Sequence, residues 1–460
     1  MDCQALFNTR CFLFGFLPIV LLGYWLMPGR NWKMAWLTGA SFLFYSFWDV
    51  RFVLLLVGAA AVDFAVAIGL ERSTRHRKAW LLASILFNLG ILAIFKYAIF
   101  AAANARSLLS FLHVPVELPY FSVVLPVGIS FFTFKTMSYT IDVYRREVPA
   151  CREPLKYLAF VSLFPELVAG PIVRYQNISH QIDHLPERPR WHFFGVGLTL
   201  LVIGLAKKVL VADTVASYID PLWASPGHLT AASAWTAALG YTLQLYFDFS
   251  GYSDMAIGIA AMLGLRFPIN FRAPYQATDP SDFWRRWHIT LSSFLRDYLY
   301  IPLGGNRKGK WRTELNLVVV MALGGLWHGA NWTFVLWGLY HGGLLMVHRI
   351  LKEPWARLPK AAQRIITLFL VLLGWVLFRA PTLAVAGKVY AAMFNVAAWG
   401  GLATPLVLAF LAGLAFTMLV KPSIEFRMRP LWVRAALCAV AFAAAVAFLE
   451  RESPFLYYQF

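Results

Sequence analysis

The sequence predicts an all-α integral membrane protein: an irregular bundle of about ten to twelve spans with further re-entrant or interfacial helices. Of the 460 residues, 60% are hydrophobic and only 14% are charged, and the mean hydropathy is +0.61. Apolar runs near the twenty residues that a bilayer requires recur along the whole chain. This composition excludes an ordinary soluble globular protein.

The expected spans follow from the apolar runs. They are residues 11–27, 34–48, 52–70, 79–103, 121–141, 155–172, 192–212, 233–264, 314–347, 365–380, 402–420 and 432–449. Several runs are shorter or longer than one span, so some segments are expected to be re-entrant or to lie at the interface. No soluble domain, low-complexity tract or clear internal repeat interrupts them, and residues 1–460 are predicted to form one transmembrane domain.

The net charge of +18 is carried by short basic clusters between the apolar runs. Such clusters are typical of the cytoplasmic ends of loops in membrane proteins. Membrane lipid is therefore an expected partner of this chain, and nucleic acid is not. Basic residues concentrate after the first, third and fifth spans, which predicts an N-terminus outside the cytoplasm.

The cysteine spacing predicts neither a disulfide framework nor a metal site. The four cysteines are scattered, without a C-x-x-C pair, and support neither a disulfide framework nor a zinc knuckle; no metal site is expected. The first apolar run lacks a cleavage site of small residues and is interpreted as an uncleaved span.

Residues 324–343 carry two histidines, His328 and His341, in an otherwise apolar and aromatic segment. A histidine at lipid depth normally faces a bundle interior or a watery cavity, which makes His328 the candidate reactive group. The structural alternative is a hydrogen-bonded core histidine, since Gly325 with Gly329 and Gly338 with Gly342 form G-x-x-x-G pairs that favour close helix packing. Spacing alone leaves both interpretations open.

Charged side chains also fall within other apolar runs, among them Lys135, Glu166, Asp248 and Asp254. Lys135 and Glu166 lie in runs with hydroxyls or prolines, which is typical of broken helices that line a cavity. Asp248 and Asp254 can act as acid and base or bind ions, or they can pair with lysine or arginine on neighbouring helices.

Residues 282–300 are too polar to span and too aromatic for an ordinary loop, so an amphipathic or re-entrant helix at the cytoplasmic interface is predicted. His288 lies in its middle; taken alone, it is more typical of a structural hydrogen bonder. The nearby G-x-x-x-x-G-K spacing is rejected as a phosphate loop because Trp311 stands where Ser or Thr must hold magnesium.

These motifs resemble the membrane-bound O-acyltransferase family, and within it the bacterial polysaccharide O-acetylation branch. The resemblance covers essentially the whole chain. It is carried by Leu6-Phe-Asn, Leu125-Pro-Val-Gly-Ile-Ser-Phe, Asp142-Val-Tyr-Arg, Leu167-Val-Ala-Gly-Pro-Ile, Phe247-Asp-Phe-Ser-Gly-Tyr-Ser-Asp, Phe283-Trp-Arg-Arg-Trp-His-Ile-Thr-Leu-Ser, Leu326-Trp-His-Gly-Ala and the closing Tyr457-Tyr-Gln-Phe.

The resemblance implies that His328 is the catalytic histidine and His288 the second active-site histidine, in a helical bundle around a central funnel and tunnel. It also implies a multi-pass protein of the bacterial inner membrane that moves acetyl groups from a cytoplasmic donor to an exopolysaccharide such as alginate or cellulose. Acetyl-CoA is the expected donor substrate, and no bound cofactor is expected. Since the chain lacks a G-x-S-x-G elbow, a periplasmic partner of the SGNH or serine-esterase type is expected to pass acetyl to the polysaccharide acceptor.

The chemistry fits a histidine. A neutral imidazole can take the proton of an acceptor hydroxyl, and apolar burial favours the neutral form. The hypothesis makes His328 the base and lets His288 orient donor or acceptor; a covalent acetyl-histidine remains an open variant.

Further candidates for substrate or donor binding surround the two histidines. Arg285 and Arg286 are expected to attract an anionic donor. Asn331 either holds the imidazole tautomer or bonds across helices. The complete set of these binding candidates is Arg285, Arg286, Trp327, Asn331, Asp248 and Asp254.

Two kinds of alternative remain. Within the family, the cargo is D-alanine for teichoic acid or acetyl for peptidoglycan. Outside it, the charged residues line the path of a transporter, which predicts inverted repeats that the sequence does not display.

Overall fold

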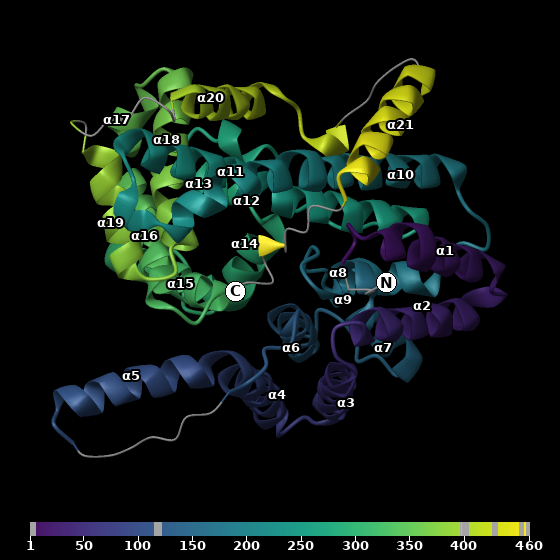
Figure 1. Cartoon of the computed structure of the whole chain (residues 1–460). Helices are drawn as coiled ribbons and strands as arrows, with labels where there is room; N and C mark the ends of the chain where they lie inside the picture. Colours follow the sequence, from purple (N-terminus) through teal and green to yellow (C-terminus); the bar gives the residue numbers. More distant parts are fainter. Residues whose placement is uncertain are drawn as a thin grey trace. The chain divides into compact units, whose positions relative to one another are not determined.

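Helices form every regular element in the part of the chain that the structure describes. This computed structural model describes residues 6–114, 122–395, 397, 404–425, 431–449 and 455–456 (Figure 1). The chain divides into two compact units. Unit 1 comprises Met1–Leu198 and Ala256–Pro268, and unit 2 comprises Thr199–Met255 and Ile269–Phe460. The predicted Tyr457-Tyr-Gln-Phe motif lies outside the described residues.

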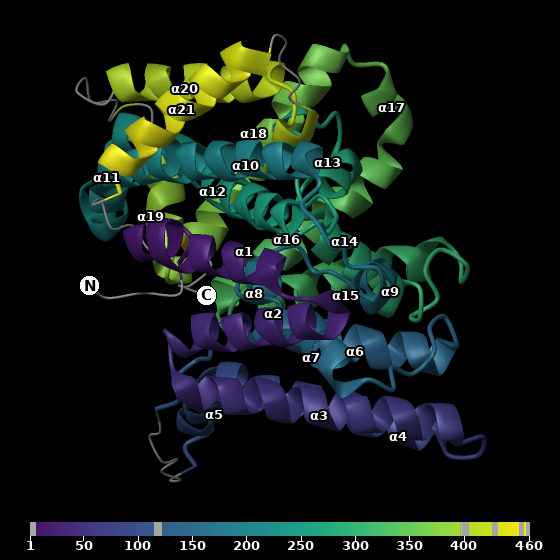
Figure 2. The ribbon, with the colours of Figure 1, turned by 90° about the vertical axis from the view of Figure 1, so that its right-hand side faces the viewer.

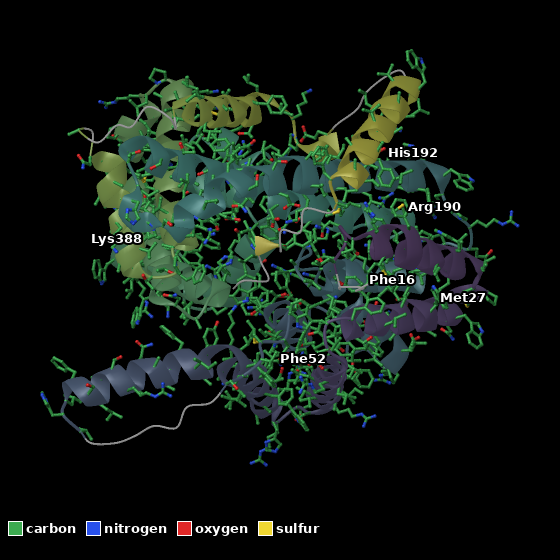
Figure 3. All side chains as sticks on the ribbon, in the orientation of Figure 1. Phe16, Met27, Phe52, Arg190, His192 and Lys388 are labelled. Atoms are coloured by element: carbon green, nitrogen blue, oxygen red, sulfur yellow. The ribbon has the colours of Figure 1, made fainter. Side chains whose placement is uncertain are left out.

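Unit 1 is built from the N-terminal helices. They are η1 (Cys11–Phe16), α1 (Leu17–Leu26), α2 (Gly29–Ser46), α3 (Val50–Arg72), α4 (Arg77–Leu92), η2 (Ala93–Tyr97), α5 (Ala98–Phe111), α6 (Ile129–Arg145), α7 (Pro154–Ser162), α8 (Phe164–Leu167), α9 (Tyr175–Asp183) and the first half of α10 (Trp191–Ala206). Phe16 and Phe52, both labelled in Figure 3, are buried in its apolar interior.

Unit 2 contains the later helices. They are η3 (Lys207–Ala212), α11 (Asp213–Ala224), η4 (Pro226–His228), most of α12 (Ala231–Met262), η5 (Pro274–Gln276), α13 (Pro280–Arg286), α14 (Ile289–Leu295), η6 (Arg296–Tyr300), α15 (Lys310–His328), α16 (Trp332–Ile350), α17 (Lys352–Ala356), α18 (Lys360–Arg379), α19 (Leu383–Phe394), α20 (Thr404–Leu419), η9 (Ser423–Glu425) and α21 (Leu431–Ala447).

The predicted all-α membrane class is confirmed. Four helical stretches among the described residues are long and apolar enough to cross a membrane: Val50–Arg72, Arg77–Phe111, Trp191–Ala224 and Lys360–Arg379. Shorter apolar helices, such as Cys11–Leu26 and Leu431–Ala447, accompany them. The number of spans and the single domain over residues 1–460 remain predictions.

The overlong apolar run 314–347 contains two helices. It is a hairpin of α15 and α16, which lie side by side in both views (Figures 1 and 2). The chain turns at Gly329–Asn331, where Asn331 adopts an extended conformation and its side chain accepts a hydrogen bond from the backbone N–H of Thr333. This N-cap starts α16 and separates it from α15.

The glycine spacing in this hairpin serves close packing, as the structural interpretation predicted. A Cβ atom on Gly325 would collide with the Phe334 carbonyl oxygen, and one on Gly338 would collide with that of Met321. The α15 and α16 backbones therefore approach closely.

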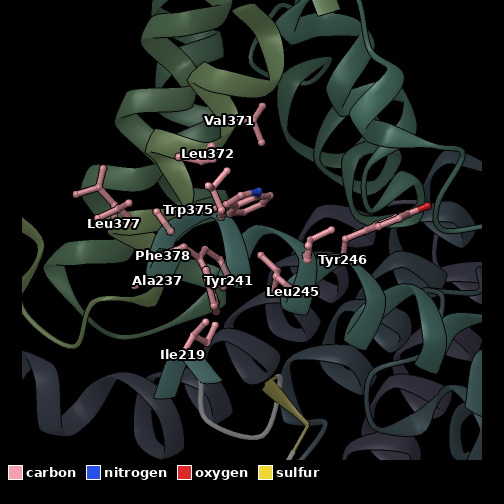
Figure 4. Packing of buried hydrophobic residues seen from close by; sticks show 14 of the residues in the cluster. Ile219, Ala237, Tyr241, Leu245, Tyr246, Val371, Leu372, Trp375, Leu377 and Phe378 are labelled. Atoms are coloured by element: carbon pink, nitrogen blue, oxygen red, sulfur yellow. The ribbon is translucent and has the colours of Figure 1, made fainter. Parts of the chain in front are cut away.

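The core of unit 2 is rich in aromatic side chains. Trp337 of α16 and Trp375 of α18 are the largest fully buried side chains, and their rings stack 5.8 Å apart between centroids. Figure 4 shows Trp375, Phe378 and Tyr241 in this cluster. The hairpin and α18 thus place a wall of rings beside the C-terminal end of α15.

The charged groups predicted in the broken helices of unit 1 form a buried ion pair. Lys135 of α6 donates to Glu166 of α8 and to the Phe160 carbonyl oxygen. A cavity of only about 10 Å³ lies beside this pair. These broken helices were predicted to line a cavity, and the cavity beside the Lys135–Glu166 pair has room for about one water molecule.

One cysteine differs from the expectation. The cysteine spacing supported no disulfide framework, but Cys11 is disulfide-bonded. Sequence spacing missed this bond because it does not report which cysteines meet in space.

Candidate active site

His328 is the last residue of α15 and faces the aromatic wall of unit 2. Its side chain is buried, with 5% of the residue exposed. The imidazole meets the rings of Trp337 and Phe378 edge to face, each at 5.2 Å between centroids. These rings come from α16 and α18, so three helices fix its surroundings.

His288 lies in the break between α13 and α14 and is fully buried. Its ring centroid is 6.2 Å from that of His328, although forty positions separate the two in the sequence. Trp327 stands beside both, at 5.0 Å from His328 and 6.0 Å from His288. The structure thus brings three of the predicted site residues together, and we call His288 and His328 the histidine pair.

The predicted helix over residues 282–300 is interrupted at this point. His288 has a left-handed backbone, with φ of 42° and ψ of 55°. A histidine in this region is uncommon, and such backbone strain concentrates at functional sites. The break turns the His288 side chain into the core of unit 2, where its ring packs against Phe249 at 4.8 Å.

Asn270 holds the His288 break in place, and sequence reasoning missed it. The Asn270 carbonyl oxygen accepts from the Ile289 N–H at 2.9 Å, and its side-chain oxygen accepts from the Thr290 hydroxyl at 2.9 Å. Its amide nitrogen donates to Ser253 of α12 at 3.3 Å. Asn270 therefore connects the first turn of α14 to α12. The only sign of this role in the sequence is that Asn270 is a polar residue between two apolar neighbours, residues 269 and 271.

Asp248 and Asp254 of α12 pair with two consecutive lysines. Asp248 lies 2.6 Å from the Lys208 ammonium, and Asp254 lies 2.6 Å from that of Lys207. Lys208 also contacts Asp213 at 2.8 Å. Both lysines lie in η3, a π-helical segment, and its wider turn brings residues five apart, Lys208 and Asp213, to the same side.

The pairing alternative for these aspartates is confirmed, and a direct contact of either with donor remains a prediction. We refer to Lys207, Lys208, Asp213, Asp248 and Asp254 as the charge cluster.

Arg285 and Arg286 lie at the end of α13, directly before the His288 break. Both contact Asp282, at 3.7 and 2.9 Å, and their side chains are 66% and 32% exposed. They line a polar cavity of about 620 Å³ together with Arg272, Gln276 and Lys421. Four cations against Asp282 and Glu425 give this polar cavity a positive balance.

Asn331 bonds across helices, which is one of its two predicted alternatives. Its side-chain amide donates to the Pro381 carbonyl oxygen at 2.8 Å while its oxygen caps α16. Pro381 follows α18, whose Phe378 packs against His328, so Asn331 ties the hairpin turn to the aromatic wall.

His341 stays outside the histidine pair. It is buried among Trp284, Trp337 and Phe283, at 5.0 Å from the Trp337 ring centroid. Among the described residues, no group of three or more His, Cys, Asp or Glu side chains is placed to hold a metal ion.

The histidine pair suits proton transfer. A neutral imidazole can accept a proton from a hydroxyl. The two ring centroids lie 6.2 Å apart, so one ring can take the proton while the other contacts a reacting atom.

Residues 119–386 match the membrane-bound O-acyltransferase family. A protein of Pseudomonas aeruginosa named "Probable alginate O-acetylase" is 43% identical over 85% of this chain and 75% of its own length. A protein of the same name from Pseudomonas putida is 40% identical over 99% of this chain and all of its own. The peptidoglycan O-acetyltransferase of Helicobacter pylori is 39% identical over 84% of this chain and 79% of its own.

The matched residues include both members of the histidine pair, Asn270 and the charge cluster. The chain belongs to the membrane-bound O-acyltransferase family and is an O-acyltransferase of the membrane.

Proposed function

We propose that this protein moves acetyl groups from cytoplasmic acetyl-CoA across the bacterial inner membrane for O-acetylation of an exopolysaccharide of the alginate type. The observation that carries the proposal is the buried histidine pair, 6.2 Å apart, inside the matched residues. Two relatives of 40% identity or more are named for alginate O-acetylation, which favours alginate as the acceptor class; none of the relatives reported above is named for cellulose.

In this reaction His328 is the general base. Its imidazole takes the proton of the attacking hydroxyl as the oxygen bonds to the thioester carbonyl carbon. The carbon–sulfur bond then breaks, and the sulfur takes the proton back from the imidazolium. His288 contacts the donor or the acceptor and orients it. An acetyl-histidine intermediate differs only in letting the imidazole nitrogen attack first.

The polar cavity is the proposed site for the phosphates of the donor. Arg285 and Arg286 line this cavity, and they end α13 three and two positions before His288. Guanidinium groups suit phosphate oxygens because they donate two hydrogen bonds at once.

A periplasmic serine-esterase-type partner is proposed to carry the acetyl group to the polymer. The N-terminus is proposed to lie outside, with the basic loops in the cytoplasm, because positive residues concentrate in those loops.

The test is acetyl transfer from radiolabelled acetyl-CoA by the purified protein in lipid vesicles, with and without the candidate partner. We expect transfer by the wild type and none by His328→Ala or His328→Gln. His184→Gln, a change of an exposed histidine in unit 1, is the matched control and should retain activity. Normal transfer by a folded His328 variant would overturn the assignment of the base.

Peptidoglycan is the second candidate acceptor, because a peptidoglycan O-acetyltransferase is 39% identical. Supplying mannuronate polymer and peptidoglycan in parallel separates the two: label on the mannuronate polymer supports the proposal, and label on peptidoglycan alone replaces it. Membership in an acyltransferase family argues against the transporter interpretation.

A further inference from the structure

An apolar cavity of about 280 Å³ lies in unit 2 where α20 and α21 cover η3 and α12. Its walls include Ile203, Phe247, Phe416 and Leu437. The lining residues of α21 are spaced at i, i+3, i+4 and i+7, so one face of this helix closes the cavity. Both covering helices follow residue 386, outside the part of the chain that matches the family.

The polar groups at the floor of the apolar cavity are already satisfied. Lys207 contacts Asp254 at 2.6 Å and donates to the Ser423 hydroxyl at 2.8 Å. That hydroxyl donates to Asp254 at 2.6 Å. The floor therefore presents a neutral, internally bonded surface to any occupant.

Two cations remain in its lining. Lys421 follows α20, and Arg434 lies in the first turn of α21. Neither makes an ion pair with a described residue; the neighbouring Glu425 pairs with Arg272 at 3.3 Å. The end of α20 is held firmly, because Gln276 donates to the Thr417 and Val420 carbonyl oxygens at 3.2 and 2.8 Å.

An apolar cavity with cations at its edge fits an amphiphile that has an anionic head. The pantetheine arm of a thioester donor is a poor fit, because its amides would lose their hydrogen bonds among Ile203, Phe247 and Leu437. A hydrocarbon chain has no such loss, and a phosphate suits paired Lys and Arg side chains. The outer faces of α20 and α21 expose Leu408, Leu411 and Val440, as expected of helices in lipid.

We propose that the apolar cavity binds one anionic phospholipid of the surrounding membrane, with an acyl chain between α20, α21 and α12 and the phosphate at Lys421 and Arg434. Lys421 and Val420 also line the polar cavity, so the lipid phosphate lies beside it. The proposal stands independently of the acetyl transfer reaction.

Cys438 provides the readout, because it is a free, half-buried thiol in the wall of the apolar cavity. The full-length protein in a neutral detergent is labelled with N-ethylmaleimide in the presence of phosphatidylglycerol, phosphatidylcholine or inorganic phosphate. Labelling of a Cys438→Ser variant gives the background from other thiols.

We expect phosphatidylglycerol to slow labelling several-fold, and phosphatidylcholine and inorganic phosphate to leave it unchanged. The double variant Lys421→Gln/Arg434→Gln should lose this protection. Arg357→Gln/Lys388→Gln, which removes two exposed charges elsewhere in unit 2, should retain it. Filling the cavity with Ala441→Trp should slow labelling without any lipid and abolish the lipid dependence.

Equal protection by phosphatidylcholine would overturn charge recognition, and protection by inorganic phosphate alone would show a free anion site in place of a lipid site. Protection that survives in the Lys421→Gln/Arg434→Gln protein, or no protection by any lipid in the wild type, would likewise overturn the proposal. A size-exclusion profile equal to that of the wild type qualifies each variant for the comparison.

Discussion

The histidine pair and the charge cluster both bury titratable side chains in unit 2, but different neighbours stabilise them. In the charge cluster, each lysine lies 2.6 Å from an aspartate, so opposite charges compensate the loss of water. The rings of Trp337, Phe378 and Phe249 pack against the histidine pair. We infer from this comparison that the paired charges hold helices together, and we propose that the imidazoles transfer protons.

The largest expected effect is the loss of catalysis at His328. His328→Gln should lower acetyl transfer by about 10²- to 10⁴-fold because it removes the general base. The unfolding temperature in detergent should stay near that of the wild type, since glutamine retains a polar side chain of similar length. A clear fall in unfolding temperature together with the loss of transfer would instead show that His328 has a structural role.

Removing Lys208 should affect folding instead. Lys208→Met leaves Asp213 and Asp248 buried without their cation, which costs about 3–5 kcal/mol of stability. Thermal unfolding in detergent measures it. Lys388→Met, at an exposed position of α19 labelled in Figure 3, is the matched control and should unfold like the wild type. Equal stability of the two variants would refute a structural role for the charge cluster.

Asn270→Ala tests whether Asn270 holds the backbone break at His288 in place. The loss of its side-chain hydrogen bonds to Thr290 and Ser253 should cost about 1–3 kcal/mol. Since Asn270 acts through His288, we expect kcat to fall more than KM changes. Asn270→Asp keeps the acceptor for Thr290 and should recover part of kcat; a uniform loss of folded protein in both variants, with kcat intact, would contradict positioning.

The smallest effect is expected at Asn331. Asn331→Ala removes the N-cap of α16 and the hydrogen bond to Pro381. We expect this to lower the free energy of unfolding by about 1 kcal/mol. Asn331→Ser preserves a capping oxygen but loses the bond to Pro381, so comparing their unfolding temperatures separates the two contributions. If the serine and alanine variants unfold together, the cap contributes nothing.

Much of the fold was accessible from the sequence because apolar length and glycine spacing act locally. The apolar runs predicted the membrane class, and the G-x-x-x-G pairs predicted close helix packing, which the structure shows between α15 and α16. The roles assigned to His328 and His288 came from the resemblance, since local spacing alone left structural interpretations open. Their proximity is an observation of the structure.

The features that were missed depend on contacts between distant segments. The left-handed backbone of His288 is stabilised by Asn270, eighteen positions earlier, and Asn270 is in turn bonded to α12. The lysine partners of Asp248 and Asp254 could not be identified from the sequence, because residue spacing does not reveal that η3 lies beside α12. The hairpin break was hidden because α15 and α16 are both apolar and only three residues separate them.

The central claim is that the buried histidines perform the chemistry and the buried charge pairs maintain the structure. It is tested most directly by measuring acetyl transfer and unfolding temperature on the same preparations of wild type, His328→Gln and Lys208→Met. The account predicts that His328→Gln unfolds like the wild type without transferring acetyl, and that Lys208→Met unfolds at a clearly lower temperature. Wild-type transfer by His328→Gln, or wild-type stability of Lys208→Met, would contradict it.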